Sequence, residues 1–285
     1  MHISSGLCSI SVCVAAAGLS VGALIASRWL DRRGAQQQLP SPALAALTAA
    51  VFVAQMVNVP VLGGSSGHVV GGALLGILAG PFRGLLAMVA ILATQAVLFA
   101  DGGLDALGVN VLNMGVIGVL GGWALQRAWA GTTVTSRALS AGFAAALATL
   151  AAAALCAVEL GLSGTTSTSS ALAAMIGAHL PIALGEGAVT GLVVALIAQP
   201  ERTSVRWPVA AAVIACALTP FASTLPDGLE HTAQQLGFAG QATAYAAPLA
   251  NYLVPGIPGA LAVICAGIIG AVIVAALVRY TPRSA

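Results

Sequence analysis

Charged residues are scarce in this chain, and lysine is absent. Only 6% of the 285 residues are charged and 59% are hydrophobic, whereas about a quarter of a soluble globular protein is charged. This composition excludes a soluble globule and predicts an all-α polytopic membrane protein. The net charge of +2 gives no indication of a nucleic-acid partner. Without lysine there is no G-x-x-x-x-G-K-[ST] phosphate loop, so a pump that hydrolyses ATP by itself has no support.

Paired cysteines are lacking as well. The five cysteines are scattered through apolar runs and form no C-x-x-C motif. Any disulfide scheme would leave one of them unpaired. We interpret them as small residues that face lipid or the protein interior.

Apolar segments separated by Pro, Gly and Arg clusters predict about nine transmembrane helices, because roughly 20 apolar residues cross the hydrocarbon core. We place them near residues 4–27, 42–62, 68–79, 84–100, 107–125, 138–160, 171–198, 207–224 and 258–278. A polar stretch at 199–206 separates a seven-helix core, residues 1–200, from a two-helix companion region, residues 207–285. Alternating crossings put all ten arginines on one side. The positive-inside rule then predicts an external amino terminus and an internal carboxyl terminus.

The third segment, residues 68–79, is too short to cross a bilayer. Its length corresponds to about 18 Å of helix, whereas the hydrocarbon core is about 30 Å thick. We expect a recessed helix with His68 near its first turn, and the glycine-rich lead at 63–67 covered by the amino terminus. Gly72, Gly76 and Gly80 form one smooth face. Internal packing and docking to a partner are both compatible with such a face.

Met1 and His2 offer three nitrogens in a row: the α-amine, the His2 backbone amide and the His2 imidazole. These can close a five-membered and a six-membered chelate ring around one ion. The predicted topology brings His68 to the same external side, as the candidate for a fourth nitrogen. A planar set of four nitrogens suits Ni(II), Cu(II) and Co(II). A histidine after the first methionine commonly has no function, so the dipeptide alone does not establish a site.

Further polar residues are candidates for supporting the metal ligands or the fold: Ser66, Asp101, Asn110, Asn113, His179 and Glu186. Asp101, Asn110 and Asn113 lie in one predicted outer loop, where carboxylates and amides could hold metal ligands in place. Turn and cap chemistry explains Asp101 equally well. His179 and Glu186 face the same way on the seventh helix. We prefer a buried His–Glu hydrogen-bond network that holds helices together over a functional role.

Taken together, these stretches resemble the CbiM/NikM family, the membrane substrate-capture components of cobalt and nickel energy-coupling-factor transporters. The residues that carry the resemblance are 1–3 (Met-His-Ile), 64–72, 101–115 and 186–190. After the boundary, residues 226–230 (Pro-Asp-Gly-Leu-Glu) and 248–256 are similar to the companion subunit called the PDGLE domain. Here the two would be fused in one chain.

The resemblance implies a component that captures Co²⁺ or Ni²⁺ from outside with Met1, His2 and His68. It implies a transmembrane coupling subunit and two cytosolic ATPase subunits as partners. The chain itself would be no enzyme, would need no cofactor and would lie in the plasma membrane of a prokaryote. One departure is Ser4-Ser5-Gly6-Leu7, where family members often have an acidic residue and Gly-Phe. The packing of the amino-terminal plug is therefore left open.

A membrane hydrolase is the competing interpretation. Residues 63–67 formally match the G-x-S-x-G pattern, with Ser65 or Ser66 as the nucleophile. That pattern requires a strand that leads into a helix within an α/β sheet, and no segment has the period of a strand. An intramembrane serine protease needs no such elbow but needs a histidine against the serine, and His179 could serve.

Overall fold

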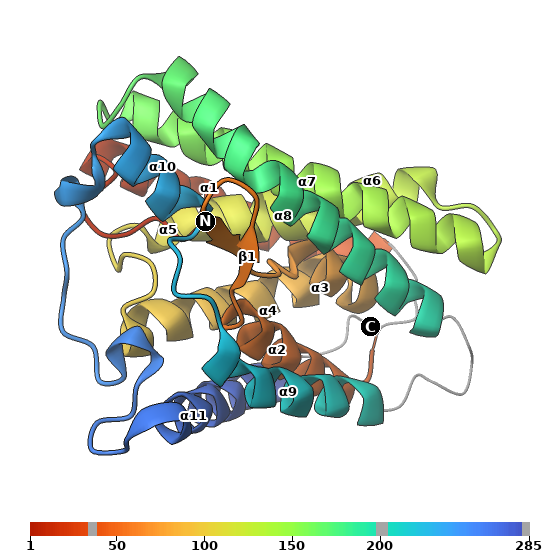
Figure 1. The fold of residues 1–285 in the computed structure, drawn as a ribbon. Helices are drawn as coiled ribbons and strands as arrows, with labels where there is room; N and C mark the ends of the chain where they lie inside the picture. The colour runs from red at the N-terminus through yellow and green to blue at the C-terminus, as the bar shows by residue number, and fades with distance from the viewer. Residues whose placement is uncertain (34–38, 198–204, 281–285) are drawn as a thin grey trace.

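Helices account for most of the residues that the computed structural model describes, which are 1–33, 39–197 and 205–280 (Figure 1). The α-helices are α1 (Ile10–Arg33), α2 (Ser41–Gln55), α3 (Gly72–Ala79), α4 (Pro81–Thr94), α5 (Leu107–Asn110), α6 (Gly122–Trp129), α7 (Val134–Leu162), α8 (Thr168–Ile197), α9 (Arg206–Leu218), α10 (Gly228–Leu236) and α11 (Gly259–Arg279). The π-helices η1 (Gln95–Phe99) and η2 (Val111–Gly121) continue α4 and α5, and η4 (Thr219–Phe221), η5 (Ala239–Gln241) and η6 (Ala250–Tyr252) are short 3-10 helices. The predicted helical fold is confirmed.

Six of the described helical segments are long and apolar enough to cross a membrane: Ile10–Asp31, Pro81–Phe99, Leu107–Trp129, Val134–Leu162, Thr168–Ile197 and Gly259–Arg279. Ser41–Gln55 and Arg206–Phe221 are apolar but shorter. With 8 residues, α3 is only about 12 Å long, as expected of a recessed helix. A helix lies near each predicted segment. The multi-pass membrane fold is thus confirmed, while the count of nine crossings and the external amino terminus stay predictions.

The first helix begins at Ile10, and the prediction of a start near residue 4 is wrong. The residues before it form an irregular segment in which Ile3 is fully buried and Gly6 has a φ of 84°. The backbone amide of Gly103 donates to the carbonyl oxygen of Ile3 at 2.8 Å. Apolar composition could not reveal this start, because a buried irregular segment is as apolar as a spanning helix.

A small antiparallel hairpin precedes α3, formed by β1 (Val59–Val61) and β2 (Ser65–Gly67). Gly63 and Gly64 turn the chain with φ values of 90° and 80°. Such values suit glycine because it has no Cβ. The expectation that no strand occurs is therefore wrong, since three-residue strands are too short to show alternation. His68 lies between β2 and α3, just before the helix begins at Gly72, which agrees with its predicted place near the first turn.

The glycine face of α3 is used for internal packing. A Cβ added to Gly72 would lie 2.8 Å from the carbonyl oxygen of Met114, and one added to Gly76 would lie 2.4 Å from that of Val119. Both oxygens belong to η2. Only glycine permits this close approach, so these two residues are not available to a docking partner.

Two helices of the companion region, α9 and α11, pack against α2 at one edge of the bundle, opposite α7 and α8 (Figure 1). Most of the predicted boundary at 199–206 lies outside the described residues, as do Arg202 and Arg283. The segment between α9 and α11 crosses back over the core. It contains α10, which lies beside the amino terminus.

Candidate metal centre

Asn110 binds the backbone of Ile3 and so holds the amino-terminal dipeptide in place. The backbone amide of Ile3 donates to Oδ1 of Asn110 at 2.8 Å, and Nδ2 of Asn110 donates back to the carbonyl oxygen of Ile3 at 3.0 Å. Met1 and His2 are only 3% and 7% exposed. The chain start is therefore an ordered, buried part of the fold rather than a solvated tail.

The His2 and His68 rings lie next to each other. Their centroids are 5.5 Å apart and the ring planes make an angle of 60°. Nδ1 of His68 is 3.0 Å from the carbonyl oxygen of Val69. A proton on this nitrogen would leave Nε2 with a lone pair for a metal ion.

Neither ring nitrogen of His2 has a hydrogen-bond partner within the described part of the chain, although both are buried. Nδ1 faces Oδ1 of Asp101 at 3.4 Å, which is too long for a good hydrogen bond. Buried polar atoms without partners are rare and costly. An ion bound between these rings would supply the missing partner.

The Met1 amine forms an ion pair with Asp227, which belongs to the companion region. The amine donates to Oδ2 of Asp227 at 2.7 Å. Burial by itself lowers the pKa of the amine, but the Asp227 carboxylate opposes this effect and the pKa ends above its ordinary value. Burial likewise opposes ionisation of Asp227, yet the amine keeps the pKa of this carboxyl well below its usual range.

The two imidazoles of the site are uncharged at neutral pH. Burial lowers the pKa of His2. Burial, together with the nearby amine and His2, lowers the pKa of His68 to about 4. Neutral imidazole is the form that binds a metal ion, so neither ring has to lose a proton first.

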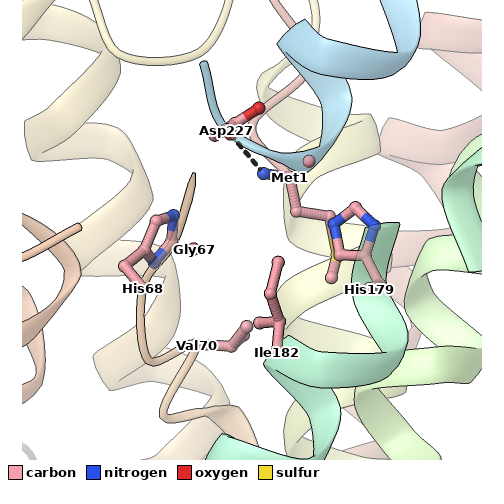
Figure 2. Close-up of a pocket in the computed structure, with 8 residues that line it drawn as sticks. Met1, Gly67, His68, Val70, His179, Ile182 and Asp227 are labelled. Carbon is pink, nitrogen blue, oxygen red and sulfur yellow. Dashed lines mark hydrogen bonds and ion pairs between the residues drawn. The ribbon is translucent and has the colours of Figure 1, made fainter. Parts of the chain in front are cut away.

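A small cavity is lined by Met1, His68, His179 and Asp227. Figure 2 shows the Met1 amine between His68 and His179, with its hydrogen bond to Asp227 drawn as a dashed line. A larger cavity of about 590 Å³ adjoins the site, and its lining includes His68, Asp101, Asp227 and Glu230. A cation can therefore approach His68 along a carboxylate-lined space.

No cluster of three or more His, Cys, Asp and Glu side chains suited to a metal ion occurs within residues 1–33, 39–197 and 205–280. Side chains of these types alone thus do not form a metal site in the described chain. The amine and backbone nitrogens at the chain start would have to supply the remaining ligands.

Of the other predicted residues, Asp101 and Asn110 lie at the site, whereas Asn113 does not contact it. Nδ2 of Asn113 donates to Glu159 of α7 at 2.6 Å, so this residue joins two helices. Both are buried. Asn113 therefore has a structural role in place of the metal-supporting role considered from the sequence.

His179 and Glu186 are both buried on α8 but form no hydrogen bond with each other, so the predicted pair is wrong. Nδ1 of His179 is 2.8 Å from the carbonyl oxygen of Met175. Glu186 accepts from the backbone amides of Val70 and Gly71, both at 2.8 Å. Seven residues make two helical turns and leave the side chains one above the other, too far apart for direct contact. Glu186 instead fixes the backbone just after His68.

The hydrolase alternative is not supported. The Ser66 hydroxyl donates to the carbonyl oxygen of Leu225 at 2.7 Å, and Ser66 also pairs through its backbone amide with the carbonyl oxygen of Pro226 at 2.8 Å. Among the described residues, neither Ser65 nor Ser66 forms a hydrogen bond with a histidine. Ser66 connects the loop that carries His68 to the companion region.

Sequence reasoning missed the contribution of the companion segment to the site. Asp227 caps α10 with Oδ1, which accepts from the amides of Leu229 and Glu230, while Oδ2 binds the amine. Gly228 lies against the ring of His179, because an added Cβ would be 2.6 Å from its Cε1 atom. The D-x-x-E capping box predicts the start of a helix here, but nothing in it indicates where that helix docks.

Comparison with known proteins identifies two families along the chain. The model of the cobalt uptake substrate-specific transmembrane region, CbiM, matches residues 2–203, and the PDGLE domain matches residues 203–281. A putative fused nickel transport protein NikMN from Archaeoglobus fulgidus is 36% identical over 97% of this chain and 96% of its own length. The cobalt transport protein CbiM of Sorangium cellulosum is 34% identical over 67% of this chain and 88% of its own length.

A solved structure described as a transition metal transporter is 30% identical and superposes with a TM-score of 0.59, over 70% of this chain and 93% of the other. A truncated transition metal transporter gives a TM-score of 0.56 at the same identity. The two family matches and the similarity to the fused relative lead to one conclusion. The chain belongs to the CbiM family of cobalt uptake substrate-specific membrane proteins, fused to a PDGLE domain.

Proposed function

We propose that this protein captures Co²⁺ or Ni²⁺ as the substrate-specific component of an ATP-driven uptake transporter. The ligands would be the Met1 amine, the His2 amide and imidazole, and the His68 imidazole. The observation that carries the proposal is the buried His2 ring, which has no hydrogen-bond partner among the described residues and lies beside His68.

The two rings lie close to the spacing that one ion requires. An ion about 2.1 Å from a ring nitrogen lies roughly 3.2 Å from the ring centroid, and in a planar set His2 and His68 would be neighbouring ligands, with centroids about 4.5 Å apart. The observed separation is 5.5 Å, so the rings would move about 1 Å closer together on binding. Nitrogen ligands also discriminate against Mg²⁺ and Ca²⁺, which prefer oxygen.

We assign separate roles to the two regions that the family models match. Residues 1–200 would form the seven-helix capture core and residues 207–285 the companion region. A transmembrane coupling subunit and two cytosolic ATPase subunits would supply the energy. The companion region contacts the surroundings of the proposed ligands at three places: Asp227 binds the Met1 amine, Pro226 accepts from the Ser66 amide, and Tyr252 donates to Asp101.

Metal binding by the purified full chain, with its native amino terminus, tests the proposal. We expect one Co²⁺ or Ni²⁺ per chain. His68→Ala should abolish high-affinity binding because it removes one of four ligands. His231→Ala is the matched control, since this histidine lies on α10 and does not line either cavity at the site. Undiminished binding by His68→Ala would refute the proposed site.

A further inference from the structure

The carboxylate of Asp101 is the acidic group that faces the His2 ring. Its Oδ1 atom lies 3.4 Å from Nδ1 of His2, the nitrogen that a six-membered chelate ring would use. The preceding residue, Ala100, has a φ of 56°, which is uncommon for a residue other than glycine. The backbone is thus held in an unfavourable conformation just where it presents Asp101 to the site.

Tyr252 of the companion region binds the other oxygen of this carboxylate. Its hydroxyl donates to Oδ2 of Asp101 at 2.5 Å. Burial, together with Asp101, raises the pKa of Tyr252 well above its ordinary value, so the hydroxyl keeps the proton that it donates. Tyr252 and the preceding Asn251 both have positive φ values, 58° and 57°. For a bulky side chain this is a strained conformation that the surroundings must stabilise.

Aromatic packing supplies that stabilisation. The Tyr252 ring stacks on Phe99 with centroids 4.6 Å apart and an angle of 18° between the planes. Phe52 lies 6.4 Å away on a tilted plane. The backbone amide of Leu249 also donates to the carbonyl oxygen of Leu98 at 2.8 Å. The ring of Tyr252 therefore contacts Phe99 and its hydroxyl contacts Asp101, two residues further along the same segment.

We propose that Tyr252 is a positioning residue of the metal site, which holds Asp101 so that its free oxygen faces His2. The inference rests on the proposed function and assigns Tyr252 a part in it. Because Nδ1 of His2 would hold the ion, the free oxygen of Asp101 would act as a negative charge beside the bound cation and not as a hydrogen-bond partner of that nitrogen. Loss of a supporting group next to a metal site typically costs about 10- to 100-fold in metal affinity. A freely rotating Asp101 would offer this support only part of the time.

Tyr252→Phe tests the proposal because it removes one hydroxyl and keeps the aromatic stack. We expect Ni²⁺ to bind the full chain at least about tenfold more weakly, with altered ligand-field absorption of the bound ion. Tyr245→Phe is the control. Its hydroxyl donates to the carbonyl oxygens of Ala96 and Gly102 and not to a carboxylate, so Ni²⁺ affinity should change less than about twofold.

A double-mutant cycle separates positioning from a general structural effect. Asp101→Asn should weaken Ni²⁺ binding by itself, and adding Tyr252→Phe should weaken it no further, because Tyr252 acts through Asp101. Unchanged affinity in either single variant, or additive losses in the double variant, would overturn the proposal. The Asp101→Asn measurement decides this even if Tyr252→Phe fails to fold.

The wild-type chain and His68→Ala show which idea has failed. If wild type binds Ni²⁺, His68→Ala does not, and Tyr252→Phe binds like wild type, only the role of Tyr252 is refuted. If wild type binds neither Ni²⁺ nor Co²⁺, the proposed function fails and the inference fails with it.

Discussion

His2 contributes two of the four proposed ligands, and its surroundings explain why it is buried. Asn110 fixes the peptide that follows it, Asp101 faces its ring, and His68 lies alongside. The dipeptide and His68 were predicted from the sequence because their nitrogens form a chelating pattern. Asp227 could not be predicted as a partner of the amine, since 226 residues separate the two and an acidic cap residue has a sufficient local explanation.

Metal capture should weaken as the pH falls. The pKa values of His2 and His68 are lowered, so these rings are already neutral at pH 7 and release no proton on binding. The pKa of the amine is raised, so binding must displace its proton, and the His2 amide releases a second. Because two protons are released when the ion binds, the affinity for the ion should fall about 100-fold for each pH unit of acidification.

Calorimetric titration with Ni²⁺ between about pH 6 and about pH 8 measures this slope. The heat of buffer ionisation gives the number of protons released independently. A Ni²⁺ affinity that does not depend on pH would show that the amine and the amide are not ligands.

At the scale of elements, α10 explains the Pro-Asp-Gly-Leu-Glu sequence. Pro226 accepts from Ser66, Asp227 caps the helix and binds the amine, and Glu230 closes the capping box by accepting from the Asp227 amide at 3.1 Å. Gly228 permits contact with His179. Pro226, Asp227 and Gly228 therefore each contact a specific residue of the core.

Gly228→Ala should disturb this docking. The new Cβ would lie 2.6 Å from the buried His179 ring, and such overpacking typically costs about 1 to 3 kcal/mol. We expect a lower midpoint of thermal unfolding and weaker Ni²⁺ binding. Gly240→Ala, at a position with no atom within 4 Å of an added Cβ, should leave both unchanged. Equal behaviour of the two variants would argue against docking of α10 on His179.

Element boundaries show where prediction from sequence fails. The helices near 138–160 and 258–278 were placed within a few residues, because they are long, apolar and bounded by polar residues. The start of α1 and the hairpin before α3 were missed. In both places the chain is apolar but irregular, and its backbone polar groups bind distant segments such as Gly103 and Pro226. Local patterns contain no information about such partners.

At the scale of the whole molecule, the companion region holds the site together from outside the core. Its helices α9 and α11 pack on α2, while the segment between them contacts the amino terminus. The fold class and the family could be predicted from composition and from motifs spread along the chain. The contacts between the two regions at the candidate site could be learned only from the structure, because no motif specifies which residues of one region contact the other.

Thiol labelling tests the predicted orientation. With an external amino terminus, Gln234→Cys on α10 should react with a membrane-impermeant maleimide in intact cells. Thr132→Cys, between α6 and α7, should react only after permeabilisation. Both residues are exposed, and the wild-type chain with its own five cysteines gives the background. The reverse labelling pattern would place the amino terminus inside.

The most direct measurement compares Ni²⁺ and Co²⁺ binding by the native chain and by a chain with one extra residue before Met1. The extension moves the amine away from His2, so the three consecutive nitrogens are no longer available to one ion, although every side chain is retained. Bound metal after purification should be about one ion per native chain and close to none for the extended chain. Equal metal content in the two proteins would contradict capture by the chain start.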